Sequence, residues 1–305
     1  MYNEHTMLHE IRVLAPAKVN IGLTVSPKRS DGFHTIYSIF TSIPLYDDLI
    51  ISSLEENDVC KVQCKFLSDD GDFEVALPEK NTLTATYRAF CELTGVNFGI
   101  HVSIQKRIPM GGGLGGGSSD AASLIYALEQ LSGVSLKMSE RYLIAEKVGS
   151  DVFFFLHCWE KKYCSAFVTG RGEVVKEFEP RTDLYFVVLC PKLHSSTKEA
   201  YAAIDEWYQR GKIRDVKLKN ESDFVQMYNS AVSDWHFSNT FTSVLTEKYP
   251  IIEEAISDLK KAGALYADMS GSGASVFGVF QDKEKCKVSL EKLRAKWNCY
   301  ARLSF

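Results

Sequence analysis

A dense run of glycines is the feature that most limits how this chain can fold. Six of the seven residues from Gly111 to Gly117 are glycine, with Pro109 just before the run and Ser118 just after it. Glycine loses more backbone freedom on ordering than any other residue, so such a cluster is expected where the chain needs positive φ or close contact with a ligand. We therefore predict a structured loop here and not a flexible linker.

The segments beside the glycines predict a strand before the loop and a helix after it. Ile100, Val102 and Ile104 alternate with polar residues, as in a half-buried strand. After the loop, apolar residues recur on one helical face, and either Ser118 or Ser119 is expected to cap that helix. The first amides of a helix have no intrahelical partner and lie at the positive end of its dipole. The order strand, glycine loop, helix therefore predicts a site for a phosphate group. The apolar face consists of Ala121, Ala122, Leu124, Ile125, Leu128 and Leu131.

Two common phosphate-binding patterns do not fit this loop. The Walker pattern ends in Gly-Lys followed by Ser or Thr, whereas Gly117 is followed by Ser118 and no lysine. The dinucleotide pattern needs an acidic residue at the end of a second strand, but the residue at that spacing is Glu129, inside the predicted helix. A different phosphate-binding family is therefore expected.

The overall composition is that of an ordinary globular protein. The chain has 305 residues, 45% hydrophobic and 24% charged, with a net charge of −4, and a length near 300 suggests about two domains. This balance gives no reason to expect a nucleic-acid partner, and no segment has the roughly 20 apolar residues of a membrane span. Met1 to Glu10 has no signal or transit pattern and the eight cysteines form no C-x-x-C pair, so we expect a cytoplasmic protein with reduced thiols.

Alternating strand and helix patterns continue along the whole chain. Helices are expected after Asn81-Thr82, from Ser139 to Gly149, after Thr197 and around 251–259. A second glycine–serine turn, Ser270-Gly271-Ser272-Gly273-Ala274, precedes the apolar run 275–280. This turn is either an ordinary hairpin or bulge, or a second wall of the nucleotide site. Strands are expected at 11–25, 49–53, 59–66, 165–169, 174–178 and 184–190.

Three separated segments together resemble the signatures of the GHMP kinase superfamily. They are Ala15-Pro16-Ala17-Lys18-Val19-Asn20, then Pro109 to Asp120, then Ser270 to Ala274. The resemblance is closest to the branch acting on a cytidine diphosphate-linked methylerythritol, because Asp31-Gly32-Phe33-His34 and Gly149-Ser150-Asp151-Val152 are also present. It implies a two-domain α+β fold, with helices packed on mixed sheets and the active site in a cleft between domains. We place the expected domains at residues 1–170 and 171–305.

The resemblance also implies an activity and a set of site residues. The activity is ATP-dependent phosphorylation of the 2-hydroxyl of 4-diphosphocytidyl-2-C-methyl-D-erythritol, with Mg²⁺ whose protein ligands remain unassigned, in non-mevalonate isoprenoid biosynthesis. Asp151 would be the catalytic base, with Lys18 oriented toward it and the reacting oxygen. Lys106 would lie near the triphosphate. The nucleotide loop would comprise Pro109, Met110, Gly111, Gly112, Gly113, Leu114, Gly115, Gly116, Gly117, Ser118 and Ser119. The substrate would be bound by Asn20, Phe33, His34, Tyr201, Gly271, Ser272 and Gly273, with Phe33 and Tyr201 on the two faces of cytosine and His34 at its edge.

Several of these residues have a simpler structural explanation. Asp151 follows a glycine stop, where an acid often only caps a short helix. Lys18 lies in an apolar strand, so it is either an outward edge lysine or an inward one that needs a partner. Tyr201 could be a core residue, and Asp120 could serve only the helix dipole.

Two other functions also stay open. One is another small-alcohol kinase, for homoserine or a mevalonate-like substrate, and the other is a nucleotide-binding protein without catalysis. In each case the expected partner is a small molecule, with neither nucleic acid nor membrane, and the chain is expected to be a monomer or weak homodimer.

Overall fold

The computed structural model describes residues 9–67, 71–161, 163–193, 195–213 and 220–302. These residues form two compact units that interleave along the chain. The first unit consists of Met1–Ala17, Tyr46–Ile108 and Gly116–Trp159, and the second of Lys18–Leu45, Pro109–Gly115 and Glu160–Phe305. The expected domain boundary at residue 170 stays a prediction. The first eight residues, which bear on the expected absence of a targeting segment, lie outside the described part.

The first unit contains a mixed sheet. Its strands are β3 (Cys60–Phe66), β4 (Phe73–Glu74), β5 (Gly99–Lys106) and the final part of β2 (His34–Leu54), in the order β4-β3-β5-β2. Strands β3 and β5 are parallel, with Cys64 opposite Ile104, and β2 pairs antiparallel to β5, with Ile51 opposite Val102. The alternation of Ile100, Val102 and Ile104 puts all three side chains in the core, at 1% exposure or less.

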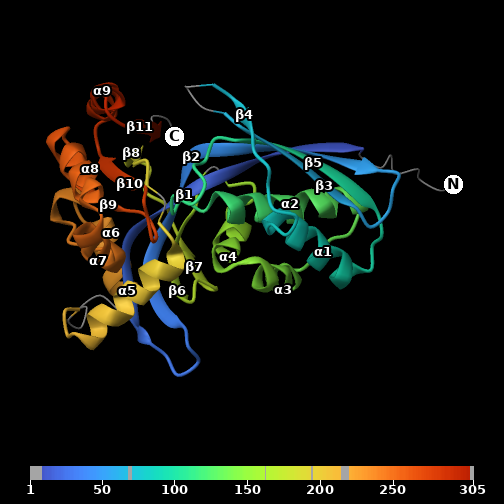
Figure 1. Cartoon of the computed structure of the whole chain (residues 1–305), viewed down its shortest axis with the longest axis horizontal. Helices are drawn as coiled ribbons and strands as arrows, with labels where there is room; N and C mark the ends of the chain where they lie inside the picture. The colour runs from blue at the N-terminus through green and yellow to red at the C-terminus, as the bar shows by residue number, and fades with distance from the viewer. Residues whose placement is uncertain (1–8, 68–70, 162, 194, 214–219, 303–305) are drawn as a thin grey trace. The chain divides into compact units, whose positions relative to one another are not determined.

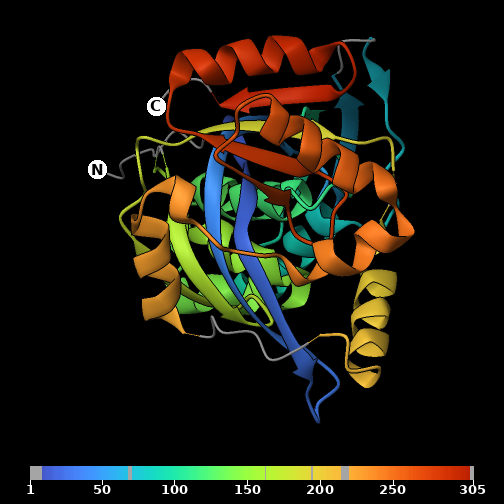
Figure 2. The same ribbon diagram turned by 90° about the vertical axis from the view of Figure 1, so that its left-hand side faces the viewer.

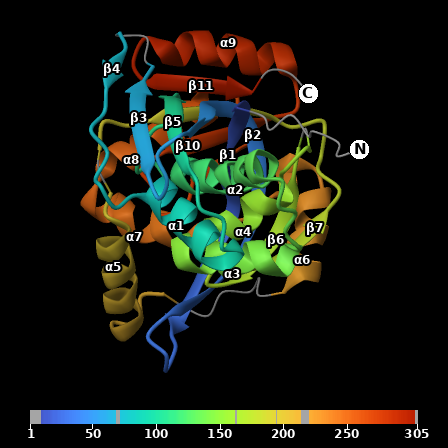
Figure 3. The ribbon, with the colours of Figure 1, turned by 90° about the vertical axis from the view of Figure 1, so that its right-hand side faces the viewer.

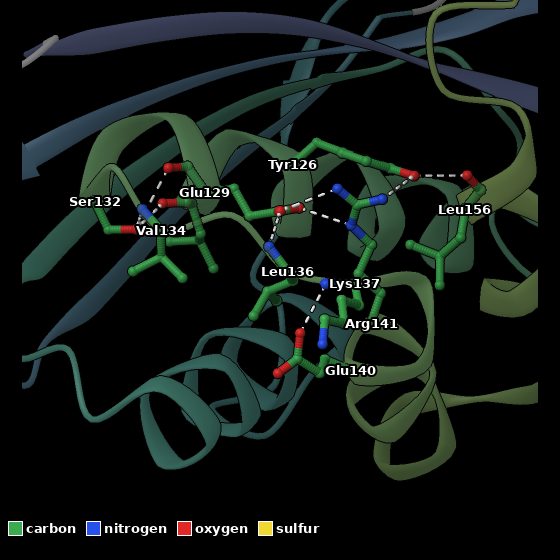
Figure 4. A network of polar contacts seen from close by, with 10 residues as sticks. Tyr126, Glu129, Ser132, Val134, Leu136, Lys137, Glu140, Arg141 and Leu156 are labelled. Atoms are coloured by element: carbon green, nitrogen blue, oxygen red, sulfur yellow. Dashed lines mark hydrogen bonds and ion pairs between the residues drawn. The ribbon is translucent and has the colours of Figure 1, made fainter.

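Four helices belong to the first unit and lie on one face of β3 and β5 (Figure 3). Helix α2 is the central one, and Leu124, Ile125 and Leu128 are fully buried. Arg141 of α3 forms a two-pronged ion pair with Glu129 of α2, which joins these two helices (Figure 4). The four helices are α1 (Thr82–Thr94), α2 (Gly116–Ser132), α3 (Met138–Val148) and α4 (Ser150–His157).

The second unit contains two groups of antiparallel strands, of which the first belongs to the same seven-stranded sheet as the strands above. One pairs the first part of β2 with β6 (Ser165–Gly170) and then β7 (Val174–Phe178). The other has the order β11-β8-β10-β9, and helix α9 lies along β11 (Figure 2). Its strands are β8 (Tyr185–Cys190), β9 (Tyr266–Met269), β10 (Val276–Phe280) and β11 (Asn298–Arg302). Strand β1 (Glu10–Lys28), like β2, contributes residues to both units.

The remaining helices of the described chain lie in the second unit, where Figure 1 labels them α5 to α9. Helix α8 starts with Pro250 at a first-turn position and buries Ile252, Ala255, Ile256 and Leu259, as its spacing predicts. The helices are α5 (Thr197–Gln209), α6 (Glu221–Asn229), α7 (Thr240–Lys248), α8 (Pro250–Lys261) and α9 (Lys283–Arg294), with a 3₁₀ turn at Val232–Asp234. In the part of the chain that was described, no helix combines the length and apolarity that crossing a membrane requires.

One local expectation was wrong, and another was right but too short. Helix α2 begins at Gly116, so Ser118 and Ser119 lie inside its first turns and neither is the cap. The glycine run itself enters the helix, which moves the start earlier than the serines suggest. The strand expected at 49–53 is the end of the much longer β2, whose earlier residues lack a clear alternation because many are buried on both faces.

Candidate active site

Three segments far apart in the sequence meet within the second unit. Lys18 Nζ donates to the carbonyl oxygen of Gly113 at 3.0 Å, and the Lys18 amide donates to Leu114 O at 2.9 Å. Ser270 Oγ donates to the same Gly113 oxygen at 2.9 Å, and the Asn20 amide donates to Ser270 Oγ at 3.3 Å. Strand β1, the glycine loop and the turn between β9 and β10 therefore converge on Gly113.

Gly113 shows why this loop needs glycine. Its φ is +77°, and a Cβ atom at this position would lie 2.0 Å from Ser270 O. Any other residue would be strained in this conformation and would also collide with the backbone of the turn. A Cβ on Gly271 would in turn lie 3.3 Å from Gly113 Cα. The turn at Ser270 to Ala274 is thus packed directly against the glycine loop.

Lys18 points inward, as the paired alternative requires. Its side chain is only 3% exposed, and Nζ donates to Asn20 Oδ1 at 2.7 Å in addition to Gly113 O. The ammonium also lies 4.7 Å from the centre of the Phe40 ring. An amide oxygen, a carbonyl oxygen and an aromatic face are all groups that bind an ammonium, so they help to compensate the burial of Lys18 beside the glycine loop.

Two of the residues expected at the cytosine lie together in the second unit. The rings of His34, at the start of β2, and Tyr201, on α5, have centroids 5.0 Å apart. His34 Nδ1 lies 2.8 Å from Ser26 O, and since a carbonyl oxygen only accepts, we assign the hydrogen to Nδ1. Nε2 faces Asp205 Oδ1 at 3.4 Å, one helical turn beyond Tyr201. This arrangement fixes the orientation of the imidazole.

Phe33 has a different environment from its neighbour His34. Its side chain is 49% exposed, and the guanidinium of Arg171 lies 4.9 Å from its ring centre. The Phe33 amide donates to Asp31 Oδ1 at 3.1 Å, a bond that lowers the pKa of the Asp31 carboxyl. The Phe33 ring is thus exposed and has a cation on one side, and such a ring is able to stack with a second flat ring.

In the first unit, Lys106 is enclosed by two carboxylates. Its Nζ lies 2.5 Å from Asp47 Oδ2 and 2.7 Å from Asp120 Oδ2, and all three side chains are 5% exposed or less. Burial lowers the pKa of Lys106, but the attraction of Asp120 and Asp47 outweighs burial and leaves that pKa raised. For Asp120, burial dominates and raises the carboxyl pKa to about 7, against the opposing pull of Lys106.

The sequence had not connected these three residues. The position of Asp120 indicates a partner of the helix dipole, and no motif marks Asp47. Asp47 stands 59 positions from Lys106 along the chain. The only available signal was the Asp47-Asp48 pair directly before the apolar run at residue 49.

Asp151 lies at the second position of α4, immediately beyond Gly149 and Ser150. The cap of this helix is Gly149 and no side-chain cap bond is present, so Asp151 is a first-turn acid and not the cap. A Cβ on Gly149 would lie 4.0 Å from Ser118 Oγ, in the first turn of α2. The amino ends of α2 and α4 therefore lie close together within the first unit, with Asp151 beside the helix that follows the glycine loop.

Comparison with known proteins identifies the family. The GHMP kinases N terminal domain matches residues 81–158, and the GHMP kinases C terminal domain matches residues 218–299. A curated relative from Treponema pallidum, named 4-diphosphocytidyl-2-C-methyl-D-erythritol kinase, is 35% identical over 294 residues, which cover 95% of this chain and 97% of the relative. The chain belongs to the GHMP kinase family.

Other relatives of this GHMP kinase agree with that assignment. A protein of the same name from Syntrophotalea carbinolica is 34% identical and covers 94% of this chain and 96% of its own. The crystal structure of a 4-(cytidine 5'-diphospho)-2C-methyl-D-erythritol kinase superimposes with a TM-score of 0.74 at 26% identity, over 95% of this chain and 98% of that one. Homoserine kinase from Cytophaga hutchinsonii, at 20% identity and a TM-score of 0.65, shares the fold. The α+β GHMP kinase fold expected from the sequence is confirmed.

The described residues of this GHMP kinase form no complete binding site for a divalent metal. They contain no group of three or more His, Cys, Asp or Glu side chains placed to hold an ion. Asp120 Oδ1 and Ser119 Oγ are buried without a hydrogen-bond partner, but the Lys106 ammonium at 2.7 Å from Asp120 opposes a second cation there. Magnesium in kinases is typically held by one or two carboxylates together with the nucleotide phosphates and water, so no protein ligand is assigned.

Proposed function

We propose that this GHMP kinase transfers the γ-phosphoryl group of ATP to the 2-hydroxyl of 4-diphosphocytidyl-2-C-methyl-D-erythritol, in non-mevalonate isoprenoid biosynthesis. The observation that carries the proposal is the relationship at 35% identity over 97% of a curated kinase named for that substrate. The local geometry supports it, because the segments expected to form the kinase site converge on Gly113 or lie at the paired amino ends of α2 and α4.

The nucleotide phosphates are proposed to bind the glycine loop and the start of α2. Backbone amides of Gly111 to Ser119 supply donors, and the positive end of the α2 dipole adds to them. Pro109, Met110 and Leu114 complete the loop, and Leu114 O is already occupied by the Lys18 amide. Lys106 is proposed to belong to this site as well, because its Nζ lies next to Gly116 at the start of α2.

In the proposed reaction, Asp151 accepts the proton of the substrate hydroxyl. Phosphoryl transfer requires mainly alignment and charge stabilisation, so one well-placed carboxylate and a few cationic groups are sufficient. The buried ammonium of Lys18 supplies positive charge for the reacting oxygens. Magnesium that arrives with ATP would neutralise phosphate charge, and no step here depends on its protein ligands.

The substrate is proposed to be held by its cytosine ring. Tyr201 and Phe33 would cover the two faces of the ring, and base stacking of this kind contributes about 1 to 3 kcal/mol per base. Stacking does not distinguish cytosine from uracil, so hydrogen bonds to the ring edge must do so, and His34 is proposed for this role. Asn20 and the turn residues Gly271, Ser272 and Gly273 would bind the remainder of the substrate.

This assignment implies a small-molecule partner, with neither nucleic acid nor membrane, and a cytoplasmic enzyme that is a monomer or weak homodimer. The sequence division at residue 170 is proposed to separate the part with the phosphate loop from the C-terminal part. Size-exclusion chromatography with light scattering measures the oligomeric state directly.

The decisive experiment is incubation of the purified protein with ATP, Mg²⁺ and the cytidylyl substrate. ADP release that depends on this substrate and is inhibited by CMP supports the proposal. Release that depends instead on homoserine or mevalonate would identify another small-alcohol kinase, and ATP binding without any product would indicate a non-catalytic protein.

The role of Asp151 is tested by Asp151→Asn. Removal of a general base lowers kcat by about 10²- to 10⁴-fold. Glu140→Gln is a matched control, because Glu140 is the first-turn acid of the neighbouring helix α3 and accepts from the Lys137 amide. Turnover should survive in Glu140→Gln, and unchanged turnover in Asp151→Asn would exclude it as the base.

A further inference from the structure

The two ends of the glycine loop are tied to one buried cluster in the first unit. At the entrance, Asp47 Oδ1 accepts from the amides of Arg107 at 2.6 Å and Ile108 at 2.9 Å, the two residues before Pro109. At the exit, Asp120 lies in the second turn of α2. Lys106 Nζ donates to both carboxylates and so links the entrance to the exit.

Side chains at the entrance also lie close to the backbone at the exit. A Cβ on Gly116 would lie 3.0 Å from Ile108 Cγ2 and 3.2 Å from Lys106 Nζ. Ile108, just before the loop, therefore contacts Gly116, the first residue of α2, just after it. Because Gly116 has no side chain, the ammonium can approach the helix start closely enough to reach Asp120.

Such a cluster addresses a physical problem of glycine-rich loops. Glycine has the largest backbone freedom, so a run of glycines loses much entropy when it orders around a ligand. Holding the two ends in place before the ligand arrives reduces that cost and increases affinity. Burial strengthens the hydrogen bonds of this cluster, because water does not compete for them. The exposed fractions are 0% for Asp47, 4% for Lys106 and 3% for Asp120.

We propose that Asp47, Lys106 and Asp120, here called the loop clamp, are positioning residues that preorganise the glycine loop for its nucleotide without contacting the phosphates. The resemblance places Lys106 near the triphosphate, and the clamp gives it a role there through the loop. The proposal rests on the proposed function only in that the loop binds a nucleotide.

The alternative is that the cluster merely stabilises the fold. Helix α2 provides an internal reference, because a second ion pair, Glu129 with Arg141, lies near its other end and away from the loop (Figure 4). A purely structural role predicts that disrupting either pair changes stability and that neither changes nucleotide affinity selectively. The loop clamp predicts that disrupting the ion pairs next to the loop lowers nucleotide affinity selectively, and that disrupting the Glu129–Arg141 pair does not.

The test is calorimetric titration of the full chain with adenylyl imidodiphosphate and Mg²⁺. Asp120→Ala should raise the Kd by about ten-fold or more, because the loop exit is released. Asp120→Asn should stay within about three-fold of the parent, since its amide oxygen still accepts from Lys106. Glu129→Ala is the matched control and should stay within about two-fold.

Steady-state kinetics adds a second readout. In Asp120→Ala, KM for ATP should rise while kcat and the KM for the alcohol substrate change by less than about three-fold, because the reacting groups are untouched. If Asp120→Ala does not fold, Asp47→Asn replaces it. Asparagine Oδ1 still accepts from the Arg107 and Ile108 amides, but its amide nitrogen cannot accept from Lys106, so the Kd should rise by about three- to ten-fold.

Unchanged affinity in folded Asp120→Ala, or in Asp47→Asn where that variant is used, overturns the clamp. An equal loss of affinity in Glu129→Ala also overturns it, because the effect would then be general. The proposed function fails differently, when the parent protein binds the nucleotide analogue but does not phosphorylate the cytidylyl substrate. In that case the comparison of nucleotide affinities still shows whether the loop clamp preorganises the glycine loop.

Discussion

The two ends of helix α2 use ion pairs in different ways. Near its start, Lys106 is enclosed by Asp47 and Asp120, all almost completely buried, with two acids for one cation. Near its end, Arg141 binds Glu129 through two hydrogen bonds of 2.9 and 3.0 Å, with side-chain exposures of 19% and 8%. The guanidinium also lies 4.4 Å from the ring centre of Tyr126 (Figure 4).

The difference is one of charge balance. One guanidinium and one carboxylate neutralise each other at the end of α2, so this pair serves as a brace between α2 and α3. At the start, two carboxyls share one ammonium, and burial raises the pKa of Asp120 to about 7, with the charge of Asp47 acting in the same direction. A buried ion cluster is weak evidence for added stability, which suggests that the start of α2 is arranged for position and the end for support.

The largest effect is expected when the cation of the buried cluster is removed. Lys106→Met should lower the free energy of unfolding by about 3 to 5 kcal/mol, because two buried carboxyls lose their counter-ion. Urea denaturation measures this change. Lys147→Met is the control, since Lys147 and Glu92 form an exposed pair at 57% and 65% exposure, where about 0.5 kcal/mol is expected. Equal losses in the two variants would contradict the distinction between buried and exposed pairs.

The raised pKa of Asp120 makes the stability depend on pH. Its folded pKa of about 7 lies above the unfolded value, which is about 3.9. The folded state therefore holds an extra proton between these values, and the associated stability is complete below the unfolded pKa and is lost as pH rises through the folded one. From about pH 5 to about pH 8 the loss from this group is about 2 to 3 kcal/mol.

The charged and titratable groups facing Asp120 are Lys106 on β5, Asp47 on β2 and the Cys64 thiol on β3. Asp120→Asn removes the titration and leaves these groups in place. Denaturation at both pH values should therefore show a smaller decline in the variant than in the parent. A parallel decline in both proteins would assign the pH dependence to other groups.

A smaller effect is expected at the other end of the helix. Arg141→Lys keeps the charge but loses the two-pronged geometry and the planar contact with Tyr126, so a loss of about 1.5 kcal/mol is expected. Nucleotide affinity should not change. A weakened affinity would mean that the brace also reaches the loop, and the contrast between the two ends would be lost.

The smallest effect concerns one hydroxyl of the brace. Tyr126 OH donates to Leu156 O at 2.7 Å, while the ring stacks on Trp159 with centroids 4.3 Å apart. Tyr126→Phe removes this hydrogen bond and the one that Arg141 Nη1 donates to the hydroxyl at 3.4 Å, and it keeps the stack, so about 1 kcal/mol of stability should be lost. A loss of more than about 3 kcal/mol would indicate that the hydroxyl organises α4 as a whole.

Much of the local structure followed from sequence spacing. The helix after the glycine loop and the strand before it are where the periodicity of their apolar residues puts them. The run Val152 to Leu156 has a weaker signal, because five successive buried residues have no period and only the glycine and the acid before it indicate the start of a short helix. The capping serines were misplaced because glycines supply the first turn of α2.

The candidate site was only partly visible in the sequence. The motifs around Lys18, Gly113 and Ser270 could be found one by one, but their convergence on a single carbonyl oxygen required the fold. Asp47 had no motif at all. Side chains in separate strands and helices become neighbours through sheet pairing and helix packing, and sequence distance contains no information about that proximity.

The amino-acid sequence alone determined that a strand, a glycine-rich loop and a helix follow one another, and that the chain resembles the GHMP kinases. Both properties depend on local spacing and residue type, which the order of the chain contains. Only the tertiary structure decided that Lys106 lies between two carboxylates and that the amino end of α4 lies near that of α2. Those contacts depend on burial, because in the low dielectric of the core a charge is stable only where the fold supplies its partner.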